Sequence, residues 1–204
     1  MFFFIYHNLA HELKTPLSVI KSDLELLEMW KELDYDIIKS SKDEIISMQD
    51  IIDSLLFLSQ KNINLDKKNL NISKFIEKNI KNKYDIENFE LDLNSNIRIK
   101  VSEKLFEILF TNLINNAIKY WNNKQKILIK LDKNSLIIEN HLKVNSLKID
   151  KNKLFDSFYQ SDDSRNSQGF WLGLNIVKKI VDLHNFNINI DIKNDLFIVV
   201  IKFK

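Results

Sequence analysis

Apolar residues recur with a helical period through the first 60 residues of the chain. In the first run they step alternately by four and three residues, which is the spacing of a heptad seam: Leu13, Leu17, Ile20, Leu24 and Leu27. The polar stretch 34–36 ends this run, and a second seam follows at Ile38, Ile45, Met48, Ile52, Leu55 and Leu58 or Ser59. The pattern predicts two helices that fold back on each other as an antiparallel hairpin.

A hairpin of two helices cannot bury two such apolar stripes by itself. A second copy of the hairpin would cover them, so the pattern favours a dimeric four-helix bundle. The alternative is that the hairpin packs against the rest of its own chain.

The pattern changes beyond the polar segment 61–71, which we interpret as a linker or a domain boundary. Strand-like alternation and helical spacing then follow one another, and 141–170 reads as irregular. The predicted helices are about 73–83, 103–121 after an N-cap at Ser102, and 173–184, and the predicted strands are 89–93, 97–101, 127–131, 136–138, 188–192 and 196–203. This order predicts an α+β protein, in which residues 1–65 form the helical hairpin and residues 70–204 form a two-layer α/β sandwich.

Glycine and proline are scarce, which limits the kinds of protein this can be. The chain of 204 residues holds two Gly and one Pro, whereas average usage would give about 14 and about 10. Collagen-like sequence and Gly/Ser linkers are excluded, and both a many-turned β-sandwich and a glycine-rich dinucleotide-binding loop are disfavoured. Hydrophobic residues make up 45% of the chain, which is enough to build a core.

The charge and the cysteine content of the chain limit which partners it can bind and which chemistry it can perform. The net charge is +2 with only two Arg, so we expect no nucleic-acid partner. The absence of Cys excludes disulfides, thiolate metal sites and thiol catalysis, and it fits a cytoplasmic protein. No apolar run approaches the ~18 residues that span a bilayer. The apolar start at 1–6 lacks the length and the basic residues of a signal peptide.

One histidine stands out by its surroundings. His11 lies off the apolar seam, and an exposed neutral imidazole is a nucleophile at physiological pH. Glu12 beside it can accept a proton from the ring. The only proline, Pro16, lies one turn later inside the predicted helix, where it removes a backbone hydrogen bond and bends the helix. The remaining histidines are interpreted as ordinary surface residues: His7, His141 and His184.

Around this histidine the sequence resembles the phosphoacceptor motif of sensor histidine kinases, the ATP-dependent half of two-component signalling. The matching run is His11-Glu12-Leu13-Lys14-Thr15-Pro16-Leu17-Ser18. The resemblance implies a dimeric helical hairpin in which His11 takes the γ-phosphoryl group of ATP and passes it to an aspartate of a response regulator. It further implies that Glu12 acts as acid and base, and that Thr15 serves a phosphatase step.

A second polar constellation lies on the predicted helix that ends near residue 121. Asn112, Asn116 and Lys119 fall at i, i+4 and i+7 and therefore form one stripe. Amide oxygens suit a hydrated Mg²⁺ and an ammonium suits phosphate; the alternative is an ordinary polar stripe in an Asn-rich chain. The stripe resembles the N box of the kinases' ATP-binding domain. By that resemblance Asn116 would hold Mg²⁺, Asn112 and Lys119 would approach the phosphates, and Tyr120 would sit near the nucleoside.

Both glycines fall in a third constellation near the last predicted helix. The run Gly169–Val177 resembles the second glycine box of the same domain, with Gly173 and Leu174 inside it, and 154–159 resembles its F box. A glycine before a helix lets backbone N–H groups approach a phosphate; turn geometry alone is the alternative. Arg165 stands where the family often places a γ-phosphate contact, and the alternative is a solvated loop charge.

The first glycine box is where the sequence departs from the family. After the predicted strand 136–138, Asn140 stands in place of the usual Asp, and no glycine follows. An Asn oxygen can still accept a hydrogen bond from the adenine amino group, without charge; Glu139 is an alternative acceptor, although strand alternation points it to the other side. We expect a remodelled backbone here, because residues with a Cβ resist positive φ. Trp171, at another glycine position, would close over the nucleotide or block it.

The resemblance covers almost the whole chain and implies a protein histidine kinase that binds ATP and Mg²⁺, forms a homodimer and serves a cognate response regulator. The altered glycine boxes leave an alternative: a weakened or inactive kinase that acts as a regulator-binding scaffold or as a phosphatase. Such kinases usually carry a sensor region upstream, often with membrane helices. We therefore expect membrane attachment only through a region absent from this chain, and a cytoplasmic location for these 204 residues.

Overall fold

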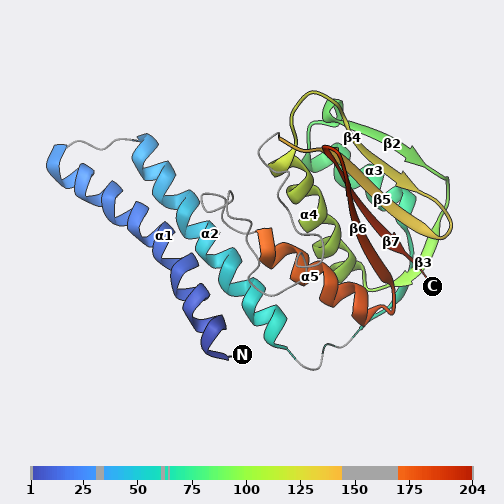
Figure 1. Ribbon diagram of the computed structural model, residues 1–204, viewed down its shortest axis with the longest axis horizontal. Coiled ribbons are helices and arrows are strands. Elements are labelled where there is room, and N and C mark those ends of the chain that lie inside the picture. The colour runs from blue at the N-terminus through green and yellow to red at the C-terminus, as the bar shows by residue number, and fades with distance from the viewer. Residues whose placement is uncertain (1, 31–34, 61–62, 64, 144–169, 204) are drawn as a thin grey trace. The chain divides into compact units, whose positions relative to one another are not determined.

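The chain forms two compact units, Met1–Gln60 and Lys61–Lys204 (Figure 1). The computed structural model describes residues 2–30, 35–60, 63, 65–143 and 170–203. Among the helices in these ranges, none combines the length and the hydropathy that a bilayer crossing requires.

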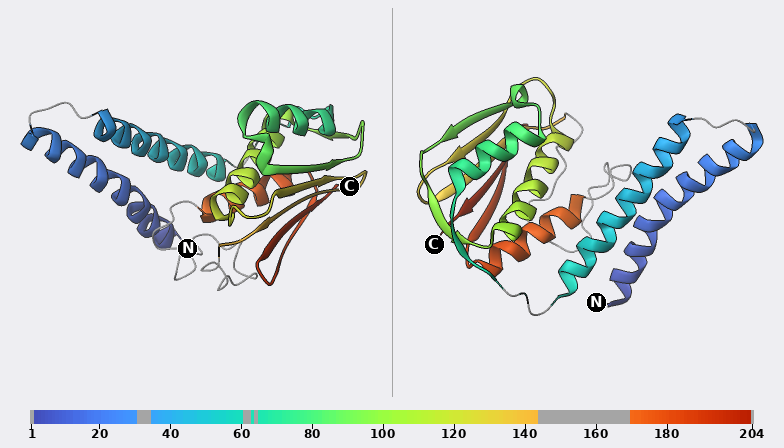
Figure 2. Two further views of the ribbon diagram at one scale, coloured as in Figure 1. Left: turned by 90° about the horizontal axis from the view of Figure 1, so that it is seen from above. Right: turned by 180° about the vertical axis from the view of Figure 1, so that it is seen from behind.

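The first unit is a helical hairpin, as the two apolar seams predict. Helix α1 spans Phe2–Trp30 and helix α2 spans Tyr35–Ser59, and the two run antiparallel along each other (Figures 1 and 2). Ser41 Oγ donates a hydrogen bond of 2.8 Å to Asp23 Oδ2 and so joins the two helices. Pro16 lies inside α1, where it is buried.

The hairpin leaves one side of each apolar seam uncovered. Leu17 and Leu24 of α1 expose 57% and 53% of their surface, and Ile45 and Ile52 of α2 expose 47% and 45%. Covering such residues is worth roughly 25 cal/mol per Å² of apolar surface removed from water. The hairpin therefore presents an apolar surface that a further helical surface would bury.

The second unit is a two-layer α/β sandwich, which confirms the predicted α+β class. Its elements are β1 (Lys68–Asn71), α3 (Ile72–Lys83), the 3-10 turn η1 (Ile86–Asn88), β2 (Phe89–Leu93), β3 (Arg98–Val101), α4 (Glu103–Tyr120), β4 (Ile127–Leu131), β5 (Ser135–His141), α5 (Phe170–Leu183), β6 (Asn187–Lys193) and β7 (Leu196–Lys202). The larger sheet has five strands in the order β2-β4-β5-β7-β6, with β2 parallel to β4 and the other neighbours antiparallel. Helices α3, α4 and α5 cover one face of it (Figures 1 and 2).

The hydrophobic core lies between this sheet and the helices. Alternate strand residues are buried because the side chains of a strand point to its two faces in turn; on β4, β5 and β7 they are Ile127, Ile129, Leu131, Leu136, Ile138, Phe197, Val199 and Ile201. Helix α4 adds residues at helical spacing, among them Leu105, Leu109, Phe110 and Leu113. One polar residue, Asn140, lies in the same inner layer and is only 2% exposed.

Two predicted boundaries are wrong. The polar segment 61–71 is not a linker throughout, because its last four residues form β1, which pairs with β3 in an antiparallel ladder. Helix α5 begins at Phe170, three residues earlier than predicted, so Gly173 lies inside the helix instead of ahead of it.

The interpretation of His184 as a surface residue is also wrong. Its side chain is 6% exposed and lies just beyond the C-terminal end of α5. Nε2 accepts a hydrogen bond of 3.1 Å from the backbone N–H of Ser102, and Nδ1 lies 2.8 Å from the carbonyl oxygen of Ile180. Ser102 does stand at the N-cap of α4, but its side chain makes no capping hydrogen bond. His184 therefore joins the end of α5 to the start of α4.

Candidate functional site

Two amide side chains of α4 meet a glycine of α5. A Cβ placed on Gly173 would lie 2.9 Å from Asn112 Oδ1 and 3.4 Å from Asn116 Nδ2. Separations under 3.0 Å are shorter than real Cβ contacts, so any other residue at 173 would displace the Asn112 amide. The helices approach this closely because glycine has no side chain. The structure thus brings together three residues that the sequence assigns to one site.

The hydrogen bonds of the two amides differ. Asn112 Nδ2 donates to the carbonyl oxygen of Ile108 at 2.8 Å, which fixes the side chain against its own helix. Asn116 Nδ2 is buried and has no hydrogen-bond partner among the described residues. A buried donor without a partner costs roughly 1–3 kcal/mol. Asn116 is therefore placed to meet an acceptor that none of the described residues supplies.

The neighbouring Asn115 faces elsewhere. It accepts a hydrogen bond of 3.1 Å from Tyr84 Oη, so it ties α4 to the residue that follows α3. Two of the three residues of the predicted stripe, Asn112 and Asn116, therefore face Gly173 of α5.

The C-terminal end of α4 carries the other two predicted residues of this helix. Lys119 is exposed, and its Nζ lies 5.7 Å from the centre of the Tyr120 ring, which is half-buried. The backbone here is joined to the end of β5: Asn122 N–H donates to His141 O at 2.8 Å, and Lys143 N–H donates to Tyr120 O at 3.0 Å. The end of α4 and the end of β5 therefore form one junction.

Asn140 brings a second unsatisfied amide to this junction. It lies on the inner face of β5 together with Leu136 and Ile138, whereas Glu139 is on the opposite face, as alternation predicts. Asn140 Nδ2 is buried and, within the described part of the chain, has no hydrogen-bond partner. Buried polar groups in proteins nearly always have partners. Two orphan donors around one helix–strand junction are the feature of this fold that most clearly indicates a ligand.

The backbone directly after Asn140 contains no glycine, and none of its described residues has positive φ. Of the described residues with a side chain, those with positive φ are Asn96, Asn123, Asn185 and Asn194. His141 and Leu142 instead continue the strand: Leu142 N–H donates to Asp195 O at 2.7 Å, and Leu142 bridges to Trp121. His141 Nδ1 lies 3.0 Å from Asp195 Oδ2, and this hydrogen bond holds the pKa of the Asp195 carboxyl below its usual value. The described residues after Asn140 therefore form an extended segment that is held by hydrogen bonds.

The remaining predicted residues lie in α5, in α1 or outside the described part of the chain. Leu174 lies in α5 with 1% of its surface exposed, so its side chain belongs to the hydrophobic core. His11, Glu12 and Thr15 lie in α1 within little more than one helical turn. Three other predictions lie outside the described residues: Arg165, Gly169 and the run 154–159.

The residues at the junction fit a magnesium–nucleotide better than a dedicated metal cage. Among the described residues no group of three or more His, Asp or Glu could hold a metal ion. Mg²⁺ usually keeps several waters and is held by a few protein oxygens together with phosphate oxygens. The amide oxygen of Asn116, beside Gly173, is a ligand of this kind.

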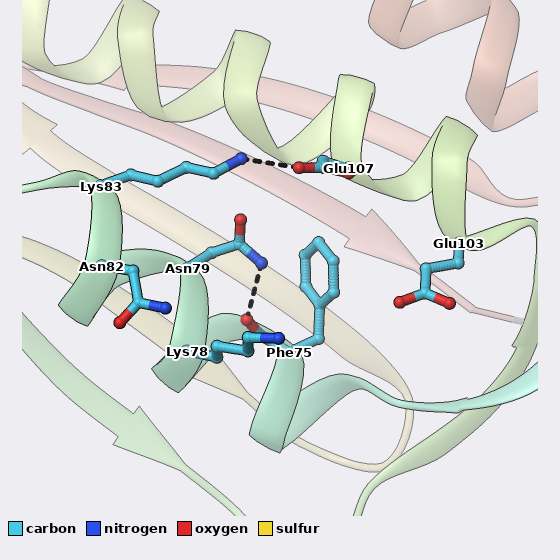
Figure 3. A pocket seen from close by; sticks show the side chains of 7 residues that line it. All are labelled: Phe75, Lys78, Asn79, Asn82, Lys83, Glu103 and Glu107. Carbon is cyan, nitrogen blue, oxygen red and sulfur yellow. Dashed lines mark hydrogen bonds and ion pairs between the residues drawn. The ribbon is translucent and has the colours of Figure 1, made fainter.

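A pocket of about 240 Å³ lies on the other side of α4, between α4 and α3 (Figure 3). Its polar groups are partly paired with one another: Lys83 Nζ lies 2.6 Å from Glu107 Oε1, and Asn79 Nδ2 donates to the carbonyl oxygen of Phe75 at 3.0 Å. Residues 107 and 116 are half a helical revolution apart on α4. The pocket is therefore separate from the junction, and of the two contacts only the Lys83–Glu107 ion pair joins α3 to α4.

Two family models match the chain. The model described as "His Kinase A (phospho-acceptor) domain" matches residues 6–62. The model described as "Histidine kinase-, DNA gyrase B-, and HSP90-like ATPase" matches residues 101–203. The first match contains His11, and the second contains α4, β5 and α5.

The chain is also similar to curated proteins. It is 32% identical over 198 residues to the signal transduction histidine-protein kinase ArlS of Staphylococcus aureus strain USA300, and the match covers 89% of this chain and 44% of that protein. ArlS of strain COL gives the same values. The chain therefore spans less than half the length of these relatives.

Solved structures share the fold. The histidine kinase AdeS of Acinetobacter baumannii matches 95% of this chain and 97% of that chain, with a TM-score of 0.71 and 22% identity. Full-length ShkA, crystallised in complex with AMPPNP, matches 97% of this chain and 46% of that chain, with a TM-score of 0.56 and 17% identity.

Proposed function

Because the chain belongs to the sensor histidine kinase family, we propose that it is an ATP-dependent autokinase that phosphorylates His11. The phosphoryl group then passes to an aspartate of a response regulator. The single observation that carries this proposal is a pair of buried amide donors, Asn116 Nδ2 and Asn140 Nδ2, around the junction of α4 and β5. Neither donor has a partner among the described residues. A ligand rich in acceptors, such as a nucleoside triphosphate, satisfies them.

Different residues around the junction contact different parts of the nucleotide. The amide oxygen of Asn116 holds Mg²⁺, while Asn112 and Lys119 approach the phosphates. Tyr120 and Asn140 lie at the nucleoside, with Asn140 at the base. Gly173 keeps α5 close to the amides and leaves no side chain in their way. Arg165 and the backbone at Gly169 complete the phosphate contacts. When bound, Mg²⁺ supplies neutralisation of phosphate charge.

The chemistry at His11 is a phosphoryl transfer, which depends mainly on positioning and on charge stabilisation. A ring nitrogen of His11 forms a bond to the γ-phosphorus while the bond from that phosphorus to the bridging oxygen breaks, and ADP leaves. The N–H proton of the imidazole passes to the Glu12 carboxylate. In the phosphatase reaction, Thr15 assists the removal of phosphate from the response regulator.

A homodimer is the natural assembly for the hairpin. The open sides of both apolar seams, represented by Leu24 and Ile52, are covered when two hairpins pack as a four-helix bundle.

Incubation of the chain with γ-labelled ATP and Mg²⁺ tests the proposal. The wild type and a His7→Ala variant, which changes the other histidine of α1, are expected to take up label, and His11→Ala is expected to take up none. Label retained by His11→Ala would remove the assignment of the phosphoacceptor.

The hydrogen-bonded segment after β5, which contains no glycine, favours a second candidate function. This is a kinase fold that binds a response regulator without efficient autophosphorylation. Calorimetry distinguishes the two candidates. Mg²⁺-dependent ATP binding supports the autokinase, whereas a chain that binds a response regulator but no ATP supports the scaffold.

A further inference from the structure

The Asn140 amide has unused hydrogen-bonding capacity of both kinds. The side chain is 2% exposed, and its Nδ2 has no partner in the described part of the chain. No hydrogen bond with a described residue selects one of the two orientations that a planar amide can take. The side chain can therefore present either its donor or its acceptor at a given point.

The side chains next to Asn140 along β5 do not share its face. Glu139 lies on the opposite face of the strand, and His141 lies beside Asp195. The backbone on both sides of Asn140 is held in the ladder with β7, where Asn140 pairs with Phe197. Asn140 thus offers a neutral amide for hydrogen bonding, and the strand that carries it is held in place by the sheet.

A carboxylate and an amide read different edges of a purine. A carboxylate only accepts hydrogen bonds, so it suits the amino group at C6 of adenine and repels a carbonyl oxygen there. An amide has one acceptor and two donors. In one orientation it pairs with the 6-amino group and N1 of adenine. Turned over, it pairs with O6 and the N1–H of a 6-oxopurine.

We propose that Asn140 lets this site accept 6-oxopurine nucleoside triphosphates as well as ATP. This inference rests on the proposed function, which places the base of the nucleotide at Asn140. A site that strands a buried polar group rejects a ligand strongly. An amide that can rotate by half a turn makes its hydrogen bonds with either purine and leaves no polar group unpaired. We therefore expect weak discrimination between the two purines.

Direct binding tests the inference, with inosine triphosphate as the probe because it carries O6 and the N1–H without the 2-amino group of guanine. Calorimetry with Mg²⁺ present measures the dissociation constants of ATP and inosine triphosphate for the intact chain. The wild type is expected to bind the two within about tenfold of each other. The Asn140→Asp variant is expected to weaken inosine triphosphate relative to ATP by about 10- to 100-fold, since a hydrogen bond to a charged group is worth about 1.5–3 kcal/mol.

The Asn115→Asp variant is the matched control. It makes the same chemical change on the side of α4 that faces Tyr84, and it is expected to leave the ratio of the two constants unchanged. A wild-type chain that binds ATP but binds inosine triphosphate more than 100-fold more weakly would overturn this inference and leave the proposed function standing. A chain that binds neither would overturn both. The wild-type ratio decides the matter even if Asn140→Asp does not fold.

Discussion

At the scale of single residues, the unusual groups of this protein are buried polar side chains. His184 has both ring nitrogens engaged, whereas Asn116 and Asn140 each keep a donor without a partner among the described residues. The first arrangement stabilises the fold and the second costs stability, because a buried group gains only when its hydrogen bonds are made. A fold that tolerates two such costs around one junction gains something else there, which we infer to be a ligand.

The free energy of unfolding is expected to decrease when the pH is lowered, because His184 is buried in its neutral form. Burial lowers the pKa of this imidazole below its usual value of 6.5, and the positive charge of Lys67 adds to the effect. The folded state therefore binds the proton less readily than the unfolded state. The resulting stability is fully present above pH 6.5, and it is lost as the pH falls from there through the folded pKa.

Replacing the ring tests this prediction. In urea unfolding at pH 7.5, His184→Gln is expected to cost about 1–3 kcal/mol, because the Ser102 N–H loses its acceptor. Between pH 7.5 and 5.5 the variant should lose less stability than the wild type. An equally steep loss in both proteins would show that other groups cause the pH dependence.

Gly173→Ala is expected to separate stability from binding. Alanine in a helix interior is favoured over glycine by about 1 kcal/mol, so the melting temperature should change little or rise. The added methyl group must displace the Asn112 amide, which it would approach to 2.9 Å, so ATP affinity should fall at least about tenfold by calorimetry. Unchanged affinity would place the nucleotide away from this contact.

Sequence alone identifies the amides of α4 by their spacing, but it does not reveal the roles of single buried groups. Asn112 and Asn116 form a stripe in any helical interpretation. Their approach to Gly173 depends on how α5 packs on α4, which no local pattern encodes. His184 resembles any surface histidine in sequence, because its acceptor role is created by a donor at Ser102, far away along the chain.

At the scale of elements, the second unit is assembled mainly by apolar contact between its helices and its sheet. Helices α3 and α4 illustrate this. Phe75 packs edge-on against Phe106 and Phe110, with ring centres 5.3 and 5.9 Å apart, whereas the Lys83–Glu107 ion pair lies half-exposed at the rim of the pocket (Figure 3). Exposed ion pairs contribute only ~0–1 kcal/mol. The aromatic cluster therefore dominates this contact.

A pair of variants tests which contact holds α3 to α4. Phe75→Ala is expected to lower the free energy of unfolding by about 3–5 kcal/mol. Glu107→Gln, which keeps the shape and removes the charge, should cost less than about 1 kcal/mol. Denaturant unfolding measures both values, and a larger loss in Glu107→Gln than in Phe75→Ala would reverse the ranking.

Periodicity predicts most of the elements, and its failures have physical causes. Helices α3 and α4 and strands β2 to β7 carry clear helical or alternating patterns. Strand β1 does not, because only Leu70 among its four residues is apolar and its pairing with β3 is made by the backbone. The start of α5 is missed because the prediction treats Gly173 as a residue that precedes a helix, whereas it serves a close helix contact.

At the scale of the whole molecule, the open apolar side of the hairpin is expected to govern assembly. Leu24→Asp places a charge on a seam residue that is 53% exposed in a single chain. In analytical ultracentrifugation the wild type should sediment as a dimer and the variant as a monomer, with helical content retained in circular dichroism. Ser22→Asp, an exposed residue off the seam, is the control and should remain dimeric. A dimeric Leu24→Asp variant would contradict the proposed bundle.

The central claim is that a nucleotide held at the junction of α4, β5 and α5 delivers its γ-phosphoryl group to His11. Mass spectrometry can locate the phosphate on the wild-type chain after incubation with Mg²⁺ and ATP, under conditions that avoid acid and so preserve phosphohistidine. We expect a single phosphorylated peptide that carries the group on His11. Phosphate on any other residue, or a chain that binds ATP and remains unmodified, would contradict it.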